Sequence, residues 1–315
     1  MKDNGLLVQY FNANTPADQT LWAKAAKDAV TLKKIGATAV WFPPATKGAA
    51  GKEDMGYAPY DLYDLGEFNQ KGSVGTRYGT KKEYLEAIDA MKAQGINVYA
   101  DIAVRQKLGA DSVEKVTAAD FNAKDIPQMI GNKKIVGALS KFTFAGRRSK
   151  YSKFKWNWNH FAGIDWQQDD FKKRVCELSG MTEEEAEKKY KLSKYDYIIG
   201  SELDLYNQEV YDELMTWAKW YEDVTGVDGF RFQEAEKVPG WFIRDFAEAA
   251  SNAGEEEKEI FTVGDFWHWR CDYINDYIAS ADNQPSMFDV PLHFSFHDAS
   301  VAEGEYDLSR LLDGS

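Results

Sequence analysis

Apolar residues along this chain alternate between short continuous runs and longer segments in which they recur every three or four positions. The short runs predict strands, over residues 6–11, 38–44 and 97–104. The longer segments predict amphipathic helices that each end at a glycine, over residues 21–35 and 81–94. Because the strands are almost entirely apolar, the pattern indicates a parallel sheet with helices on its faces.

This alternation of strand and helix patterns stops between residues 105 and 200, where the chain is charged and includes a charged helical pattern at 182–190. The alternation then resumes, with helical patterns over 208–222, 241–253 and 302–312 and with apolar runs that predict strands over 226–232, 259–266 and 286–294. Six βα units with one long excursion predict an α/β fold, an incomplete TIM (β/α)₈ barrel. We expect a first barrel part, an inserted subdomain after the third strand and a second barrel part, at 1–104, 105–200 and 201–315.

Composition excludes several kinds of partner. The formal net charge of −13 would repel the phosphates of nucleic acid and the surface of an anionic membrane. No apolar run is long enough to span a bilayer and no secretory signal begins the chain, so we expect a cytoplasmic protein. The two cysteines and four histidines show no metal-binding spacing. The many aromatic residues suit stacking on sugars and suit core packing equally.

Several strings of residues resemble the α-amylase family of glycoside hydrolases, in particular its single-chain bacterial liquefying type. They occur in the family's order along nearly the whole chain, at Trp41-Phe-Pro-Pro-Ala45, 56–68, 77–80, Val227-Asp-Gly-Phe-Arg231 and 288–293. Strings of this length and order imply a shared fold, and they say much less about a shared activity.

The resemblance places Gln233 where the family carries its nucleophilic aspartate. A neutral amide can neither attack a sugar carbon nor stabilise an oxocarbenium ion as a carboxylate does. Arg231, which orients the nucleophile in the family, is retained, and strand alternation places it on the same face as Gln233. Glu234 would replace the nucleophile only through a slip of one residue, which would also turn Arg231 outward.

Asp265 stands where the family carries the glutamate that acts as general acid. Its side chain is one methylene shorter, and a displacement of order 1 Å costs about 10²-fold in rate. A satisfied carboxylate at the end of a strand is the alternative interpretation. The family's fourth motif has no counterpart before Ser315, so we expect strands seven and eight and the C-terminal β domain to be absent.

The family's calcium ligands are also altered. Arg105 and Gln106 stand where the family has an asparagine that binds calcium and a histidine that donates to a sugar hydroxyl. A guanidinium cannot ligate calcium, because hard cations need oxygen. Lys153 replaces an aspartate as well. We therefore expect the family's calcium site to be lost, and we expect no other cofactor.

Four positions are candidates for contact with a sugar. Tyr57 matches the family's tyrosine that stacks on the sugar, Gln106 can hydrogen-bond a hydroxyl, and Trp267 follows the acid position as a platform. Asp101 completes the candidate set. The structural alternative is that Tyr57 packs within a loop and that Arg231 forms a buried ion pair with Asp101.

Three functions stay open. The first is a pseudoenzyme of α-amylase ancestry with a role in α-glucan binding or in an assembly. The second is an active retaining α-1,4-glucan hydrolase with shifted catalytic residues, and the third is a fragment without a function of its own. Because an incomplete barrel leaves its first and sixth strands with open edges, we expect a second polypeptide or a homo-oligomer to cover them.

Overall fold

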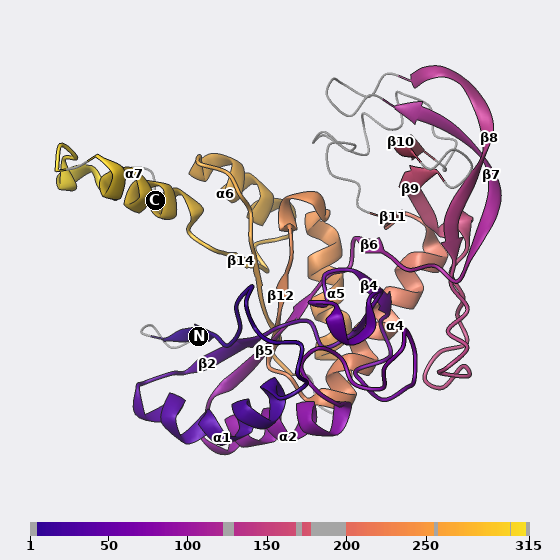
Figure 1. Cartoon of the computed structure of the whole chain (residues 1–315). Coiled ribbons are helices and arrows are strands. Elements are labelled where there is room, and N and C mark those ends of the chain that lie inside the picture. The colour runs from indigo at the N-terminus through magenta and orange to yellow at the C-terminus, as the bar shows by residue number, and fades with distance from the viewer. Residues whose placement is uncertain are drawn as a thin grey trace.

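The computed structural model describes residues 5–121, 129–167, 172–177, 200–254, 258–302 and 304–312. Within them, six parallel strands form a curled sheet that resembles an open part of a barrel (Figure 1). In sheet order they are β1 (Leu7–Gln9), β2 (Ala39–Phe42), β5 (Asn97–Ile102), β12 (Gly229–Phe232), β13 (Phe261–Gly264) and β14 (Ser286–Met287). The incomplete barrel predicted from the sequence is confirmed.

Helices connect these strands, as α1 (Leu21–Lys34), α2 (Lys81–Ala93), α4 (Gln208–Thr225), α5 (Gly240–Ser251), α6 (Cys271–Ser280) and α7 (Val290–Val301). Local signals set several of their ends. Thr80 and Glu83 form a reciprocal capping box at the start of α2. Gly226 ends α4 in the left-handed conformation, with φ of 64°. No helix of the described ranges is long and apolar enough to cross a membrane.

A second, antiparallel sheet follows β5 along the chain. Its strands are β6 (Gln106–Lys107), β7 (Ser112–Phe121), β8 (Met129–Lys141), β9 (Phe161–Gln167), β10 (Lys172–Glu177) and β11 (Ser201–Leu203). All of its strands except β11 lie in the part of the chain in which the sequence predicts an inserted subdomain, and the boundaries at 105 and 200 stay a prediction. The charged helical pattern at 182–190 lies outside the described residues.

The C-terminal third departs from the sequence-based prediction. The strand predicted at 286–294 is wrong, because only Ser286–Met287 pair with β13 and α7 follows. The carboxylate of Asp289 accepts a hydrogen bond from the Leu292 N–H, and Pro291 suits the first turn of a helix. Helix α6 was not predicted, and in place of a helix at 302–312 there is a 3₁₀ turn at Leu308–Arg310.

Much of the aromatic content packs the core. The rings of Trp22 and Tyr84 are fully buried with centroids 4.7 Å apart, and Trp22 also lies 5.3 Å from Phe42. The hydroxyls of Tyr84 and Tyr221 share a hydrogen bond of 2.9 Å that joins α2 to α4. For these residues core packing, rather than sugar stacking, is the confirmed interpretation.

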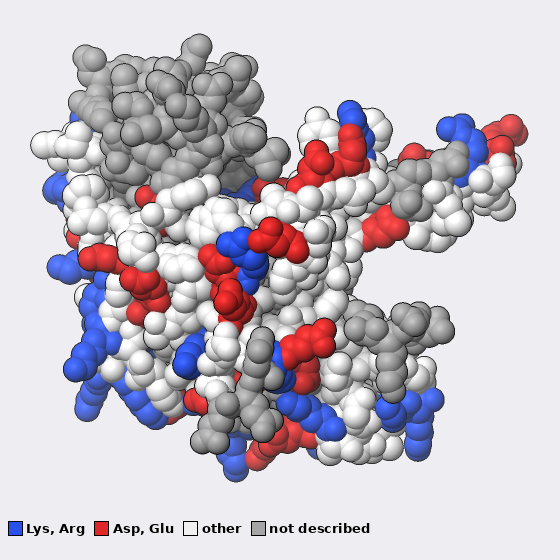
Figure 2. All heavy atoms as spheres, turned by 180° about the vertical axis from the view of Figure 1, so that it is seen from behind, with Lys and Arg blue, Asp and Glu red and all other residues white. Residues whose placement is uncertain are grey.

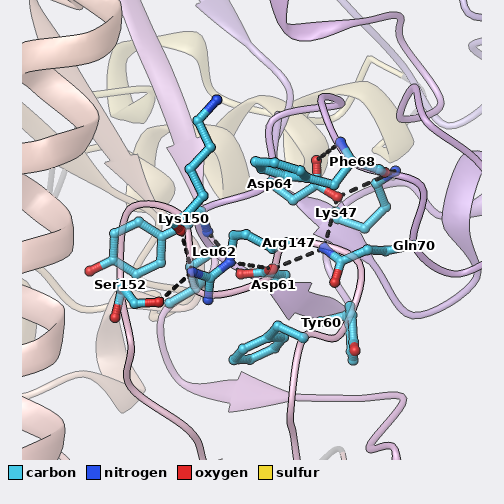
Figure 3. Close-up of polar contacts among 12 residues, drawn as sticks. Lys47, Tyr60, Asp61, Leu62, Asp64, Phe68, Gln70, Arg147, Lys150 and Ser152 are labelled. Atoms are coloured by element: carbon cyan, nitrogen blue, oxygen red, sulfur yellow. Dashed lines mark hydrogen bonds and ion pairs between the residues drawn. The ribbon is translucent and has the colours of Figure 1, made fainter.

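Buried ion pairs hold the loop that follows the short hairpin of β3 (Lys47–Gly48) and β4 (Pro59–Asp61), as Figure 3 shows. Lys47 Nζ lies 3.6 Å from Asp64 Oδ2 and donates to the backbone carbonyls of Phe68, Ser73, Val74 and Gly75 at 2.6–3.4 Å. Arg147 Nε donates to Asp61 Oδ2 at 2.8 Å. The amide of Gln70 bridges the Asp61 and Asp64 carboxylates, at 2.9 and 3.0 Å. Each buried charge therefore has a partner, which burial requires.

Lys107 in β6 is a buried cation of a different kind. Its Nζ has no hydrogen-bond partner among the described residues. Three rings surround it at centroid distances of 5.5, 5.6 and 5.1 Å, those of Phe142, Phe144 and Trp156. Burial lowers the pKa of Lys107 to about 7, since the ammonium loses its water, and the carboxylates of Asp61 and Glu213 oppose this fall only in part.

We expect Lys107→Met to stabilise the protein in a pH-dependent manner. The pKa of an unfolded lysine is about 10.4, so between about pH 7 and pH 10 the folded state binds fewer protons than the unfolded state. The stability of the wild type therefore rises with pH in this window, and the advantage of the variant shrinks by roughly 1 kcal/mol per pH unit. Urea unfolding from about pH 7 to pH 9 measures this, with Lys141→Met, an exposed position of β8, as control. An advantage that does not change with pH would contradict the assignment.

Candidate active site

Three neighbouring strands bring charged residues together at their C-terminal ends. Arg231 of β12 lies directly opposite Asp101 of β5 in the strand register, and Asp265 follows β13. Partners in register on parallel strands point to the same face of a sheet. In barrels of parallel strands, this end carries the functional site.

Arg231 clamps both carboxylates. Its Nη1 donates to Oδ1 and Oδ2 of Asp101 at 3.0 and 3.1 Å, and its Nη2 donates to Asp265 Oδ2 at 2.5 Å. The guanidinium also lies 4.7 Å from the ring centroid of Trp41. The three charged side chains are buried. The structure therefore forms the ion pair that the structural interpretation of Arg231 predicts, and it adds Asp265 to that pair.

Asp101 and Tyr57 extend the same network. The Tyr57 hydroxyl donates to Asp101 Oδ2 at 2.6 Å. Burial raises the pKa of Asp101 to about 6, although the charge of Arg231 opposes this rise. Burial and the neighbouring Asp101 raise the pKa of Tyr57, so its hydroxyl keeps its proton and acts as a donor. The buried Gln106 is engaged too, because its Nε2 donates to the carbonyl of Tyr57 at 3.1 Å.

Both oxygens of Asp265 are occupied. Oδ2 accepts from Arg231, and Oδ1 accepts from the backbone N–H of Glu234 at 2.7 Å. A general acid must present a proton to the leaving group at hydrogen-bond distance. In this arrangement the carboxylate of Asp265 accepts charge-assisted hydrogen bonds from the protein itself. The geometry is that of the satisfied strand-end carboxylate in the alternative interpretation.

Gln233 directly follows β12, two residues after Arg231. Its backbone N–H donates to the carbonyl of Ile102 at 3.2 Å, and the residue is half-buried. Within the described part of the chain its side-chain amide makes no hydrogen bond. The amide is therefore available to solvent or to a ligand, but it carries neither the charge nor the nucleophilicity of a carboxylate.

Glu234 is held by two cations. Its backbone is left-handed, with φ of 49°. Its Oε2 accepts a hydrogen bond from Arg105 Nη2 at 2.8 Å, and its Oε1 accepts one from Lys237 Nζ at 2.6 Å. Although burial acts in the opposite direction, these two partners lower the pKa of Glu234. Arg105 Nη1 also lies 3.6 Å from Glu202 Oε1 of β11. Arg105 therefore links the second sheet, through Glu202, to the barrel, through Glu234.

Comparison with known proteins identifies the family. No family model matches the chain. The chain is 42% identical to an α-amylase of Geobacillus stearothermophilus over 98% of its length and 56% of that protein. It is 38% identical to an α-amylase of Bacillus licheniformis over 99% of this chain and 60% of that protein. It is 35% identical to the cytoplasmic α-amylase of Escherichia coli strain K12 over 99% of this chain and 63% of that protein. The chain belongs to the α-amylase family. It spans little more than half the length of these relatives.

Solved structures agree on the fold of this α-amylase-family chain. An α-amylase of Geobacillus thermoleovorans in complex with acarbose superposes with a TM-score of 0.55 at 16% identity, over 92% of this chain and 52% of that one. An α-amylase of Malbranchea cinnamomea superposes with a TM-score of 0.55 at 14% identity, over 94% of this chain and 53% of that one. At these identities the likeness shows the fold alone.

The chemistry of Arg105 bears on the calcium ion that the family resemblance implies. The guanidinium lies between the carboxylates of Glu202 and Glu234, and it supplies positive charge where a metal ion would need oxygen ligands. Over the described ranges, no three His, Cys, Asp or Glu side chains are grouped so that they could hold a metal. These residues therefore do not fit a calcium ion at this position.

We expect calcium to leave the melting temperature of this α-amylase-family chain unchanged. The Arg105 guanidinium already supplies the positive charge between Glu202 and Glu234, so an added divalent cation meets repulsion there. Differential scanning calorimetry with millimolar calcium, with magnesium as a control and with a chelator, measures the effect. Micromolar binding of calcium in isothermal titration, together with a rise in melting temperature, would contradict this expectation.

The structure places the sequence-predicted site residues in three groups. One connected network of hydrogen bonds joins Arg231, Asp101, Asp265, Tyr57 and Gln106. Gln233 lies beside this network with its amide unengaged. Trp267 lies apart, 56% exposed, with its ring 5.4 Å from that of His293.

Sequence reasoning missed two contributors to the site. Trp41, at the end of β2, packs its ring against the guanidinium of Arg231, and its place in the Trp-Phe-Pro-Pro string could have signalled this. The pairing of Arg105 with Glu234 and Glu202 had no signal in the sequence, because these residues lie more than ninety positions apart along the chain.

Proposed function

We propose that this chain is a noncatalytic module of the α-amylase family that takes part in α-glucan metabolism by binding or by assembly. Its relatives indicate descent from α-glucan hydrolases. One observation carries the proposal, namely that Arg231 clamps both Asp101 and Asp265 while position 233 holds a neutral amide. We also propose a cytoplasmic location, which the cytoplasmic relative of Escherichia coli supports.

Glycoside hydrolysis with retention needs two carboxyl groups with different duties. One attacks the anomeric carbon and the other first donates a proton and later removes one, at a separation of about 5–5.5 Å. Gln233 cannot form a glycosyl ester, and the Asp265 oxygens are held by Arg231 and by the Glu234 N–H. This supports the loss of both duties.

The second function considered, an active hydrolase with a shifted nucleophile, would rely on Glu234. That carboxylate would have to leave Arg105 and Lys237 and would have to turn toward the substrate from a left-handed backbone. Both ion pairs are partly or fully buried, and breaking one partner from such a pair is costly. The geometry therefore favours the noncatalytic function.

Three features support a retained role in binding α-glucan. The amide of Gln233 offers a donor and an acceptor, and the half-exposed Tyr57 and the exposed Trp267 offer aromatic faces. Sugar sites combine aromatic faces with a few polar groups that set the orientation of the ligand. Titration calorimetry with maltohexaose measures such binding directly, and Trp267→Ala is expected to weaken it.

A reducing-sugar assay on soluble starch tests the loss of catalysis. We expect no hydrolysis by the wild type, and hydrolysis by the wild type would refute the proposal. The double variant Gln233→Asp with Asp265→Glu restores both carboxyl groups, while Gln233→Asn with Asp265→Glu is the matched control without the nucleophile. Activity in the first variant alone shows that the pocket still holds glucan. No hydrolysis by either variant favours an architectural role.

A further inference from the structure

A cluster of aromatic and charged side chains lies on the loop between β13 and α6 and on the first turn of α6. The α6 cluster, as we call it, consists of His268, Trp269, Arg270, Asp272 and Tyr273. Trp269 is 68% exposed and Tyr273 is 46% exposed, although much of the chain's aromatic content is buried. Seen from behind, the surface over α6 mixes acidic, basic and uncharged atoms and carries no broad patch of one charge (Figure 2).

The rings of the α6 cluster hold one another in place. The His268 ring stacks on the Tyr273 ring, with centroids 4.3 Å apart and an angle of 23° between the planes. The Trp269 plane lies at 16° to the His268 plane, with centroids 6.1 Å apart. The Arg270 guanidinium lies 5.0 Å from the ring centroid of Tyr273 and 5.9 Å from that of Trp269. The orientation of the rings is therefore set without a ligand.

The loop that carries the cluster is fixed to the body of the protein. Nδ1 of His268 accepts a hydrogen bond from the Arg270 N–H at 3.1 Å. The buried ring of Phe266 packs against Tyr277 of α6 with centroids 5.2 Å apart, and the Tyr277 hydroxyl donates to the Val238 carbonyl at 2.7 Å. Because these contacts orient the rings in advance, a ligand that stacks on them costs little conformational entropy.

The two charges of the cluster cancel locally. Arg270 Nε donates to Asp272 Oδ1 at 2.9 Å, and Arg270 Nη2 donates to Asp272 Oδ2. The pair has no net charge that would attract an ionic ligand, and the centres of protein interfaces are depleted of charged residues. It still offers N–H donors and carboxylate acceptors beside the rings. This chemistry fits a neutral ligand with many hydroxyl groups.

We propose that the α6 cluster binds an α-glucan chain, at a site separate from the pocket around Gln233. The apolar faces of the sugars stack on Trp269, which offers the largest exposed ring, and Tyr273 adds a second ring and a hydroxyl. The sugar hydroxyls pair with Arg270 and Asp272. The choice of α-glucan rests on the proposed function, whereas the fit to a neutral, hydroxyl-rich ligand rests on the cluster itself.

Trp267, the aromatic residue assigned above to the pocket, belongs to a different group of rings. Its ring centroid lies 5.4 Å from that of His293 and 6.5 Å from that of Phe294, both on α7. Trp269 packs instead within the α6 cluster. Because the two tryptophans have different neighbours, single substitutions can separate the two sites.

Titration calorimetry of the 315-residue chain with maltohexaose counts the sites. We expect two binding events in the wild type, of which Trp269→Ala removes one and Trp267→Ala removes the other. Tyr273→Ala is expected to weaken the event that Trp269→Ala removes by roughly fivefold or more, since aromatic anchors dominate binding surfaces. Trp158→Ala is the matched control, because Trp158 is 37% exposed and lies outside both groups of rings. It should bind as the wild type does.

The outcomes separate this proposal from the proposed function. If Trp269→Ala binds maltohexaose with the wild-type stoichiometry and affinity, the α6 cluster is not a glucan site, whatever Trp267→Ala does. An equal loss in Trp158→Ala, or no binding by the wild type, also overturns the proposal. So does binding that disappears at about 1 M salt, where charge interactions are screened beyond about 3 Å. Hydrolysis of starch by the wild type would refute the noncatalytic function and leave the α6 cluster untouched.

Discussion

Replacing Arg231 by methionine is expected to lower the free energy of unfolding by about 3–5 kcal/mol, because two buried carboxylates lose their common partner. Asp101 loses both hydrogen bonds from Nη1, and Asp265 loses its short contact with Nη2. Urea unfolding near neutral pH measures the loss. Without the opposing charge of Arg231 the pKa of Asp101 in the folded variant rises above the wild-type value of about 6, so the loss shrinks as the pH falls toward about 6 and stays constant below it.

Two control variants separate this effect from a general loss of charge. Arg231→Lys keeps the cation without its planar fork and should recover part of the stability. Arg270→Met breaks an exposed pair with Asp272 and should leave the free energy of unfolding nearly unchanged. If Arg231→Met unfolds at the same denaturant concentration as the wild type, the network does not support the fold and the account of the site is wrong.

Lys47→Met is expected to destabilise the protein to a similar extent, again by about 3–5 kcal/mol. The substitution removes a fully buried ammonium from the Asp64 carboxylate and from the four loop carbonyls it contacts. The Phe68 and Val74 carbonyls then lose their donor, and the buried Asp64 carboxylate keeps its bond from Gln70 but loses its counter-charge. Thermal unfolding followed by circular dichroism detects the change.

The control for Lys47 is Lys52→Met in the same segment. Lys52 is exposed and its nearest carboxylate oxygen, from Glu53, is 4.0 Å away, so its loss should change stability by less than about 0.5 kcal/mol. Equal effects of the two substitutions would show that burial of the Lys47 ammonium contributes nothing.

The first three strands and the helices between them were predictable from sequence. Their apolar runs are bounded by glycine or proline, and the observed ends at Lys34 and Ala93 lie within a residue of the predicted ones. The segment after residue 286 misled the prediction, because Leu-His-Phe-Ser-Phe alternates as a strand does while Asp289 and Pro291 start a helix. The period of the apolar residues alone could not reveal that, in the described part of the chain, only Val290 and Pro291 of this helix are buried.

At the site, the substitution at 233 and the Asp101–Arg231 pair could be predicted, since register and alternation follow from the strands. The capture of Asp265 by Arg231 could not, because it depends on how a loop end meets a neighbouring strand. The pairing of Arg105 with Glu202 and Glu234 depends likewise on how the second sheet docks on the barrel. Long-range ion pairs of this kind carry no local sequence signal.

On the proposed noncatalytic function, the contacts of Arg231 with Asp101 and Asp265 act as internal supports, and Arg105 gives the junction with the second sheet a permanent positive charge. Such pairing allows charged residues to stay buried at the ends of the barrel strands. The groups left for contact with a ligand are then the unengaged amide of Gln233 and the exposed ring of Trp267.

The central claim is that no side chain of this site forms a covalent bond with a sugar. Intact-protein mass spectrometry after incubation with a fluorinated maltosyl donor, which slows the breakdown of a glycosyl ester, tests it most directly. The account predicts an unchanged mass for the wild type under conditions that label an active α-amylase. A stable adduct on the wild type, mapped to Glu234, Asp265 or Asp101, would contradict it.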